Sequence, residues 1–185
     1  MLTGRNSVRG FTLVELMIGV VVMGILLALA TPSFSLWMAN TRVRNSAEAI
    51  QNGLQIARAE AVRRNRFVQF VLTNTVPSAA NVNAVAEDAN GTNWMVRVFD
   101  PAGNYAADDF IRGREGSEGS EDVTVGSTQA TVTFTGLGRL NAAGMVQIDL
   151  MNAATDRPLR LVVDTAGLIR MCDPNVTNAG DPRIC

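Results

Sequence analysis

The chain of 185 residues contains no histidine and no lysine. Without histidine, the common zinc sites and the Ser-His-Asp or Cys-His nucleophiles of hydrolases are excluded. Without lysine, Schiff-base chemistry and the Walker type of phosphate loop are excluded as well. Because no group of nucleophile, base and stabiliser can be assembled from the rest, we expect no catalytic residue, no metal, no cofactor and no small-molecule substrate.

Basic charge is supplied by 16 arginines alone, against 17 acidic residues, which gives a net charge of -1. If the first ten residues were removed, Arg5 and Arg9 would leave with them. The balance would then be 14 against 17, or -3. Such a charge argues against bulk electrostatic capture of nucleic acid.

Cysteine is scarce: Cys172 and Cys185 are the only two, with 12 residues between them. This spacing suits a closed loop and differs from the CxxC pattern of redox and metal sites. An exported domain would oxidise the pair, and a bridge closing a loop of about 14 residues contributes roughly 3 kcal/mol in the chain-entropy model. Two free thiols are the alternative.

Charge is nearly absent from the N-terminal region. After Arg5 and Arg9, an apolar run extends from Phe11 to Ala30, and about 20 apolar residues suffice to span a bilayer. Glu15 interrupts the run, and an ionisable group in a membrane span is functional by default. The two arginines predict a cytoplasmic N-terminus. Cleavage after Gly10 would place a free ammonium one helical turn from Glu15, which suits subunits that neutralise one another.

Two other interpretations of this region remain open. A secretory signal peptide also begins basic and apolar, and residues 28–30 offer a cleavage site of the A-x-A type, so that the mature chain would begin at Thr31. The run is longer than the usual signal-peptide core of about 7 to 15 residues. A plain single-span anchor explains the length but gives Glu15 no purpose, since an unpaired carboxylate there costs several kcal/mol.

The string RGFTLVELMIGVVVMGILLALATP resembles the N-terminus of type IV pilins and type II secretion pseudopilins. The resemblance implies that a membrane prepilin peptidase cuts between Gly10 and Phe11 and methylates the new N-terminus at Phe11. It implies that Glu15 pairs with the amine of a neighbouring subunit during assembly. The partners it implies are other minor and major pilins or pseudopilins.

The periodicity predicts that the helix continues beyond the span. Apolar residues recur at alternating steps of three and four and form one stripe: Leu36, Ala39, Val43, Ala47, Ile50, Leu54, Ala57 and Ala61. Polar residues occupy the opposite face, so residues 31–66 are expected to be an amphipathic helix laid against something apolar. Pro32 is expected to kink the helix, because proline removes one backbone bond and clashes with the preceding turn.

From residue 67 the pattern changes to short β-branched or alternating runs separated by Gly, Asn, Asp and Ser clusters. The strand candidates are 67–72, 94–99, 123–125, 130–134, 146–150, 159–163 and 168–171, and 112–122 is expected to be a flexible acidic loop. The predicted class is therefore α+β, with the amphipathic helix covering a β domain. The predicted division is a leader at 1–10, a membrane helix at 11–30, its continuation at 31–66 and a periplasmic β domain at 67–185.

Three C-terminal segments are similar to the GspH/FimT branch of minor pilins and pseudopilins: TFTGLG at 133–138, DTAGLIRMCDP at 164–174 and GDPRIC at 180–185. The resemblance implies a long N-terminal helix packed on an antiparallel β-sheet domain, and a role in the tip or priming complex of a filament. It does not separate a type IV pilus from a type II secretion system. The double-cysteine tail favours the pilus by analogy alone.

Arginine placement raises a second hypothesis, because some FimT-type proteins are associated with DNA uptake. Arg160, Arg170 and Arg183 are the candidate phosphate ligands, since arginine contacts phosphate bidentately. A third class is an exported enzyme on a pilin-like anchor. It is disfavoured because the sequence shows no combination of nucleophile, base and stabiliser. The leading interpretation is a single-pass inner-membrane protein, with the N-terminus cytoplasmic and the β domain periplasmic, that is later incorporated into a pilus or pseudopilus.

Overall fold

The structure is a computed structural model that describes residues 10–116, 118, 122–155 and 157–185, with only the backbone described at 30–32. Most of the predicted leader therefore lies outside the described residues, as does the side chain of Pro32. The chain divides into two compact units, Met1–Trp37 and Met38–Cys185, each of which is described by itself. The predicted α+β class is confirmed by one long helix and two antiparallel sheets.

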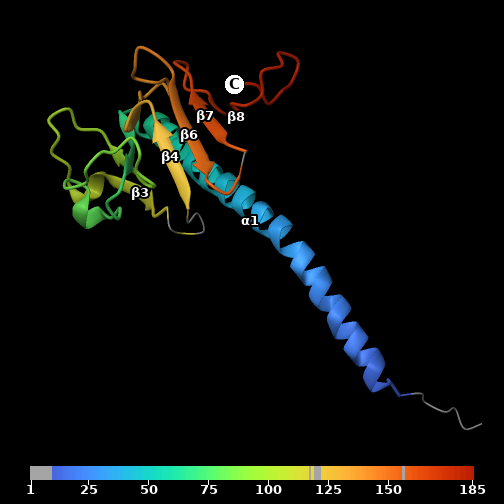
Figure 1. Cartoon of the computed structure of the whole chain (residues 1–185). Helices are drawn as coiled ribbons and strands as arrows, with labels where there is room; N and C mark the ends of the chain where they lie inside the picture. The colour runs from blue at the N-terminus through green and yellow to red at the C-terminus, as the bar shows by residue number, and fades with distance from the viewer. Residues whose placement is uncertain (1–9, 117, 119–121, 156) are drawn as a thin grey trace, which may run out of the picture. The chain divides into compact units, whose positions relative to one another are not determined.

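Helix α1 extends from Leu13 to Arg64 and crosses from the first unit into the second (Figure 1). In the described part of the chain, no single helix alone meets the length and hydropathy expected of a membrane span. The segments Leu13–Leu29 and Ser33–Arg64 meet it as a bent pair. The kink predicted at Pro32 stays a prediction.

The end of α1 is set by Asn65. This residue has a positive φ of 50°, the left-handed conformation that commonly terminates helices and that asparagine tolerates. The backbone N–H of Arg66 donates to the carbonyl of Ala61 at 3.2 Å, which satisfies one of the last helical carbonyls. The chain then turns directly into the first strand.

In the described part of the chain, eight strands form two four-stranded antiparallel sheets. Sheet A has the order β3-β2-β1-β5 and contains β1 (Val68–Thr73), β2 (Asn93–Val98), β3 (Phe110–Arg114) and β5 (Thr131–Phe134). Sheet B has the order β4-β6-β7-β8 and contains β4 (Val123–Ser127), β6 (Val146–Asn152), β7 (Leu159–Val163) and β8 (Ile169–Cys172). Figure 1 shows the labelled strands of sheet B beside the C-terminal part of α1.

The main core joins α1 to one face of each sheet. The α1 stripe from Val43 to Ala61 packs in one cluster with residues of sheet A such as Phe70 and with residues of sheet B such as Ile148. Gly53 permits the close approach of the helix, because a Cβ there would lie 2.7 Å from Cε2 of Phe70. The stripe prediction is correct from Ala39 onward, whereas Leu36 is 50% exposed. Leu36 belongs to the first unit, whose described residues include no strand that could cover it.

Sheet A has a second cover on its other face. Val71 and Met95 pack there with Val82 and Val85 of the β1–β2 connection. The guanidinium of Arg97, a residue only 3% exposed, donates to Gln69 Oε1 at 2.9 Å, to the Val82 carbonyl at 3.1 Å and to Glu87 Oε1 at 2.6 Å. Because both faces are covered, every residue of β1 is buried.

One prediction about the β domain is wrong. Residues 112–114 belong to β3 and are not part of a loop. The sequence Phe-Ile-Arg-Gly-Arg lacks the usual pattern of a strand, because two of its five residues are charged and one is glycine. Each of the seven predicted strand segments overlaps a strand of the structure.

Candidate functional site

Of the N-terminal candidate residues, Phe11 lies just before α1 and Glu15 lies in its first turn. Thr12 precedes the helix, and its Oγ1 accepts a hydrogen bond from the backbone N–H of Glu15 at 3.2 Å. This is the geometry of an N-cap residue, which satisfies one of the free N–H groups at the start of a helix. Glu15 is the acidic residue of the first turn, where the helix dipole favours negative charge.

Thr12 was not among the predicted site residues. The signal was present as Thr-x-x-Glu immediately before an apolar run, which is the pattern of a capping box. The cap defines where the helix begins and therefore places Glu15 at a fixed position in the first turn. Phe11, just outside the helix, is 84% exposed.

A shallow groove follows one face of this part of α1. It brings Phe11 and Glu15 together with Gly19 and Gly24, and its other lining residues are Leu16, Val20, Met23 and Leu27. A Cβ added at either glycine would meet nothing within 4 Å. The groove is an uncovered apolar surface whose one charged group is Glu15, and its glycines permit the close approach of another helix.

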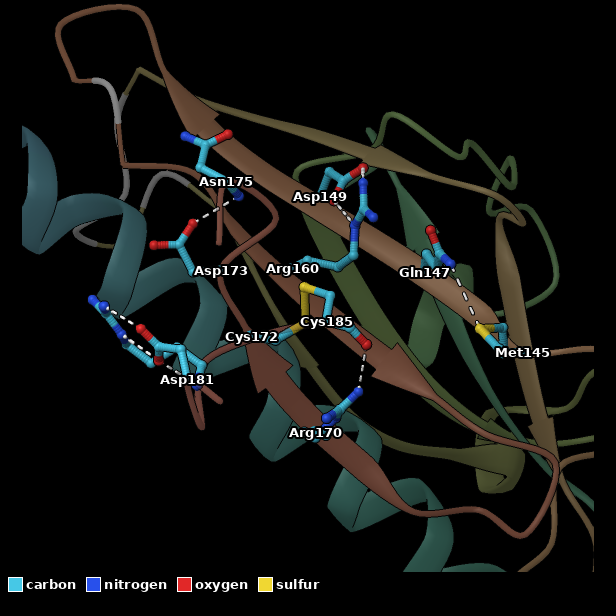
Figure 2. The surroundings of a disulfide bond; sticks show 11 residues. Met145, Gln147, Asp149, Arg160, Arg170, Cys172, Asp173, Asn175, Asp181 and Cys185 are labelled. Carbon is cyan, nitrogen blue, oxygen red and sulfur yellow. Dashed lines mark hydrogen bonds and ion pairs between the residues drawn. A yellow bond between two sulfur atoms is a disulfide. The ribbon is translucent and has the colours of Figure 1, made fainter. Parts of the chain in front are cut away.

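The second candidate site is the C-terminal tail, which Cys172 and Cys185 join by a disulfide (Figure 2). Cys172 ends β8 and is buried, so the bond ties the last residue of the chain to the edge of sheet B. Nη2 of Arg170 donates to the carbonyl of Cys185 at 2.7 Å, as Figure 2 shows. Within the tail, an isolated bridge pairs Asp173 with Ile184.

An ion pair fixes the turn within this tail. Nη2 of Arg183 lies 2.7 Å from Oδ2 of Asp181. Hydrogen bonds from the Arg183 side chain and backbone stabilise the charged carboxylate and lower the pKa of Asp181 to about 2. At neutral pH the carboxylate is therefore fully ionised and already paired.

Only two of the three candidate DNA-binding arginines come together. Arg160 and Arg170 line one groove on the open face of sheet B, with Met145, Gln147, Val162, Asp164, Leu168 and Cys185. Arg183 lines a different groove, next to Arg157. The sequence could not predict this separation, because it depends on the path of the C-terminal tail between Cys172 and Cys185.

Each of these three side chains already has a partner. Arg160 forms a bidentate pair with Asp149, at 2.6 Å and 2.9 Å, and this hydrogen bonding raises the pKa of Arg160 (Figure 2). Arg183 is paired with Asp181, and Arg170 donates to Cys185. Phosphate would have to compete with these neighbours, so DNA binding by Arg160, Arg170 and Arg183 stays a hypothesis and gains no support from the geometry.

The acidic residues do not gather into a metal site. Within the described part of the chain, no three His, Cys, Asp or Glu side chains are placed to hold one ion. Asp122 instead pairs with Arg42 of α1 at 2.9 Å, and Glu118 lies 3.5 Å from Arg114.

These features define a class of fold: an α+β domain whose first helix begins with an uncovered apolar segment. The family model for type II transport protein GspH matches residues 46–167, and the model for the prokaryotic N-terminal methylation motif matches residues 5–31. The chain therefore belongs to the GspH family, and it is a minor pilin or pseudopilin with a methylation motif.

Two solved structures of a type IV minor pilin show the same fold. The type IV minor pilin FimU of Pseudomonas aeruginosa is 21% identical, with a TM-score of 0.58, over 77% of this chain and 99% of that one. A second crystal form of FimU gives 20% identity and a TM-score of 0.54, over 73% and 99% of the two chains. Escherichia coli GspH is 16% identical over 76% and 94%, with a TM-score of 0.47. Among curated protein sequences, none matches the chain.

Proposed function

We propose that the chain is cleaved by prepilin peptidase between Gly10 and Phe11, methylated on Phe11 and incorporated into a type IV pilus or type II secretion pseudopilus. The observation that carries this proposal is the uncovered apolar face of α1, where Glu15 is the only charged residue beside the new N-terminus. The methylation motif spans the same residues. Within the filament we propose the tip or priming complex, the position that the family resemblance implies.

The chain begins as a single-pass inner-membrane protein in this proposal. The arginines before Gly10 hold the N-terminus in the cytoplasm, and the unit that begins at Met38 lies in the periplasm. The disulfide between Cys172 and Cys185 fits such an oxidising compartment. During assembly, neighbouring helices replace lipid around residues 11–30.

Pairing with another subunit removes the cost of Glu15. A lone carboxylate in lipid is costly, whereas a carboxylate next to an N-terminal ammonium is neutralised. Cleavage after Gly10 creates that ammonium on each mature subunit. The carboxylate of one subunit and the amine of the next are therefore complementary once both helices share an apolar environment.

The direct test is the mature N-terminus. The chain is produced in its native host or with a cognate prepilin peptidase, and the membrane form is analysed by mass spectrometry. We expect a chain that begins with N-methylated Phe11. A chain that begins at Thr31 would show removal of a signal peptide and would refute the proposal.

The role of Glu15 is tested by Glu15→Ala. We expect normal membrane insertion, because removing a charge makes the span more apolar, and a loss of incorporation into sheared filaments of about tenfold or more, since breaking a buried ion pair costs more than 1.4 kcal/mol. Thr41→Ala, an uncharged change on the same helix, is the control. Full incorporation of Glu15→Ala would exclude the pairing mechanism.

A further inference from the structure

The uncovered apolar surface of α1 continues past the membrane span that we propose. From Leu16 to Thr41 the chain has 26 residues without a charged side chain. At 1.5 Å per residue such a helix is about 39 Å long, compared with a hydrocarbon core of about 30 Å. If the span is perpendicular to the membrane plane, several uncharged residues therefore lie outside the hydrocarbon core.

Two aromatic residues lie in the segment between the proposed span, which ends at residue 30, and the buried stripe, which begins at residue 39. Phe34 and Trp37 are three residues apart and so share one face of α1, and their ring centroids are 5.8 Å apart. Both side chains are exposed, at 60% and 61%. Burial by the β domain begins only at Ala39, which is 5% exposed. The first unit thus ends on an exposed aromatic pair that belongs to neither the apolar run nor the domain core.

The position of this pair matches one layer of a bilayer. The span proposed above ends at Ala30, and residues 34 and 37 lie about 6 Å and about 10 Å farther along the helix. Helical side chains lean back toward the N-terminus, so both rings reach the headgroup layer, which is about 5 to 8 Å thick on each side of the hydrocarbon. Tryptophan and other rings with a polar edge are enriched at this depth.

We propose that Trp37, with Phe34 packed against its ring, forms an interfacial anchor that sits in the periplasmic headgroup layer and fixes the depth of the membrane-anchored subunit. The occupant of this helix face before assembly is the phospholipid headgroup region and not another protein. The proposal rests on the membrane-anchored state proposed above. It assigns a function to the segment between the span and the domain, which the pairing of Glu15 leaves unexplained.

The chain offers a clean spectroscopic test because it has only two tryptophans. Trp94 is 3% exposed and packs on Phe70 inside the β domain, whereas Trp37 is exposed. The full chain is reconstituted into phosphatidylcholine vesicles with lipids brominated either near the headgroup end or near the terminus of the acyl chain. The contribution of Trp94 is obtained from a Trp37→Phe variant, so that the core of the domain is left intact.

Two further variants calibrate depth in the Trp37→Phe background. Met23→Trp places a reporter near the middle of the proposed span, and Gln55→Trp places one on the exposed face of α1 in the second unit. We expect the shallow bromines to quench Trp37 at least about twofold more than the deep ones, as for an interfacial ring. Met23→Trp should show the reverse order, and Gln55→Trp should respond to aqueous iodide alone.

Flotation of the vesicles separates the two levels of the proposal. If the chain floats with the vesicles and Trp37 behaves like Gln55→Trp or like Met23→Trp, the interfacial anchor is refuted while membrane storage stands. If the chain does not float, the membrane-anchored state is refuted, and the anchor with it. Flotation together with preferential shallow quenching supports both.

Discussion

The two halves of α1 are both rich in apolar residues, yet only the second is buried by its own chain. Between Leu13 and Leu29 the large apolar side chains are 49% to 76% exposed. In the second half, the stripe residues from Ala47 to Ala61 are at most 1% exposed. The first half is apolar on all sides, as expected of a helix that lipid or other helices surround. The comparison teaches that stability and assembly are assigned to different stretches of one helix.

The largest expected effect comes from a matched pair of leucines. Leu54→Ala should lower the free energy of unfolding of the β domain by about 2 to 5 kcal/mol, because it leaves a cavity between α1 and the sheets. Leu26→Ala, at a residue that is 59% exposed, should leave that stability unchanged. Denaturant unfolding of both full-length variants in detergent measures the difference. Equal losses would mean that the first half also contributes to the domain.

The C-terminal tail, residues 173–185, can be used to test whether a covalent bond takes the place of apolar packing. Like the first half of α1, residues 173–185 contribute nothing to the clusters of buried apolar residues in the described part of the chain. The tail is fixed instead by the bond between Cys172 and Cys185. Replacing both cysteines with serine should cost roughly 3 kcal/mol of domain stability. An unchanged denaturation midpoint would show that the ion pair and hydrogen bonds of the tail suffice.

Two glycines of α1, one in each half of the helix, allow the two halves to be compared by adding a single Cβ atom. At Gly53 a new Cβ would lie 2.7 Å from Cε2 of Phe70, and overpacking of this kind costs about 1 to 3 kcal/mol, partly offset by the better helix propensity of alanine. At Gly24 a Cβ meets nothing. We therefore expect Gly53→Ala to lower the thermal midpoint of the domain and Gly24→Ala to leave it unchanged. The midpoints are read by circular dichroism, and an equal response would contradict the packing account.

The smallest expected effect is a titration in the tail. The pKa of Asp181 is lowered from 3.8 to about 2 by Arg183. A depressed pKa in the folded state means that the pair adds stability at pH values above 3.8 and that this stability is lost as the pH falls toward 2. Carboxylate titration by NMR should place the pKa of Asp181 near 2 in the native chain. In Arg183→Gln the pKa should rise toward 3.8 but stay below it, because the backbone N–H of residue 183 still donates to the carboxylate. A normal value in the native chain would show that the pair does not persist in solution.

Periodicity predicted most of the fold because it reports burial directly. The stripe from Ala39 to Ala61 follows the helical repeat, and β6 alternates buried with partly exposed residues over most of its length. Strand β3 was not predicted, because Arg112 and Arg114 interrupt the apolar pattern expected of a buried strand. The burial of Arg97 could not be read from the sequence either, since its partners Gln69 and Glu87 come from a neighbouring strand and a distant connection.

The candidate sites divide in the same way. The N-terminal site could be proposed from contiguous residues, because Gly10, Phe11 and Glu15 lie within about one and a half helical turns. The arginine site could not, because whether Arg160, Arg170 and Arg183 meet depends on strand order and on the path of the tail. Local motifs can be recognised from the sequence alone, whereas the convergence of side chains that are distant in the sequence cannot be predicted from it.

The sequence by itself determined the apolar N-terminal run with its single acid, the periodic stripe that follows and the spacing of two cysteines. Those features depend on hydrophobicity and on contacts between residues close along the chain. Only the tertiary structure decided that the strands separate into two sheets around α1, that Arg97 becomes a buried donor to three partners and that Arg160, Arg170 and Arg183 each donate to a neighbouring acceptor. Each of these depends on which distant groups are brought within hydrogen-bond or van der Waals range, and chain order alone does not specify that.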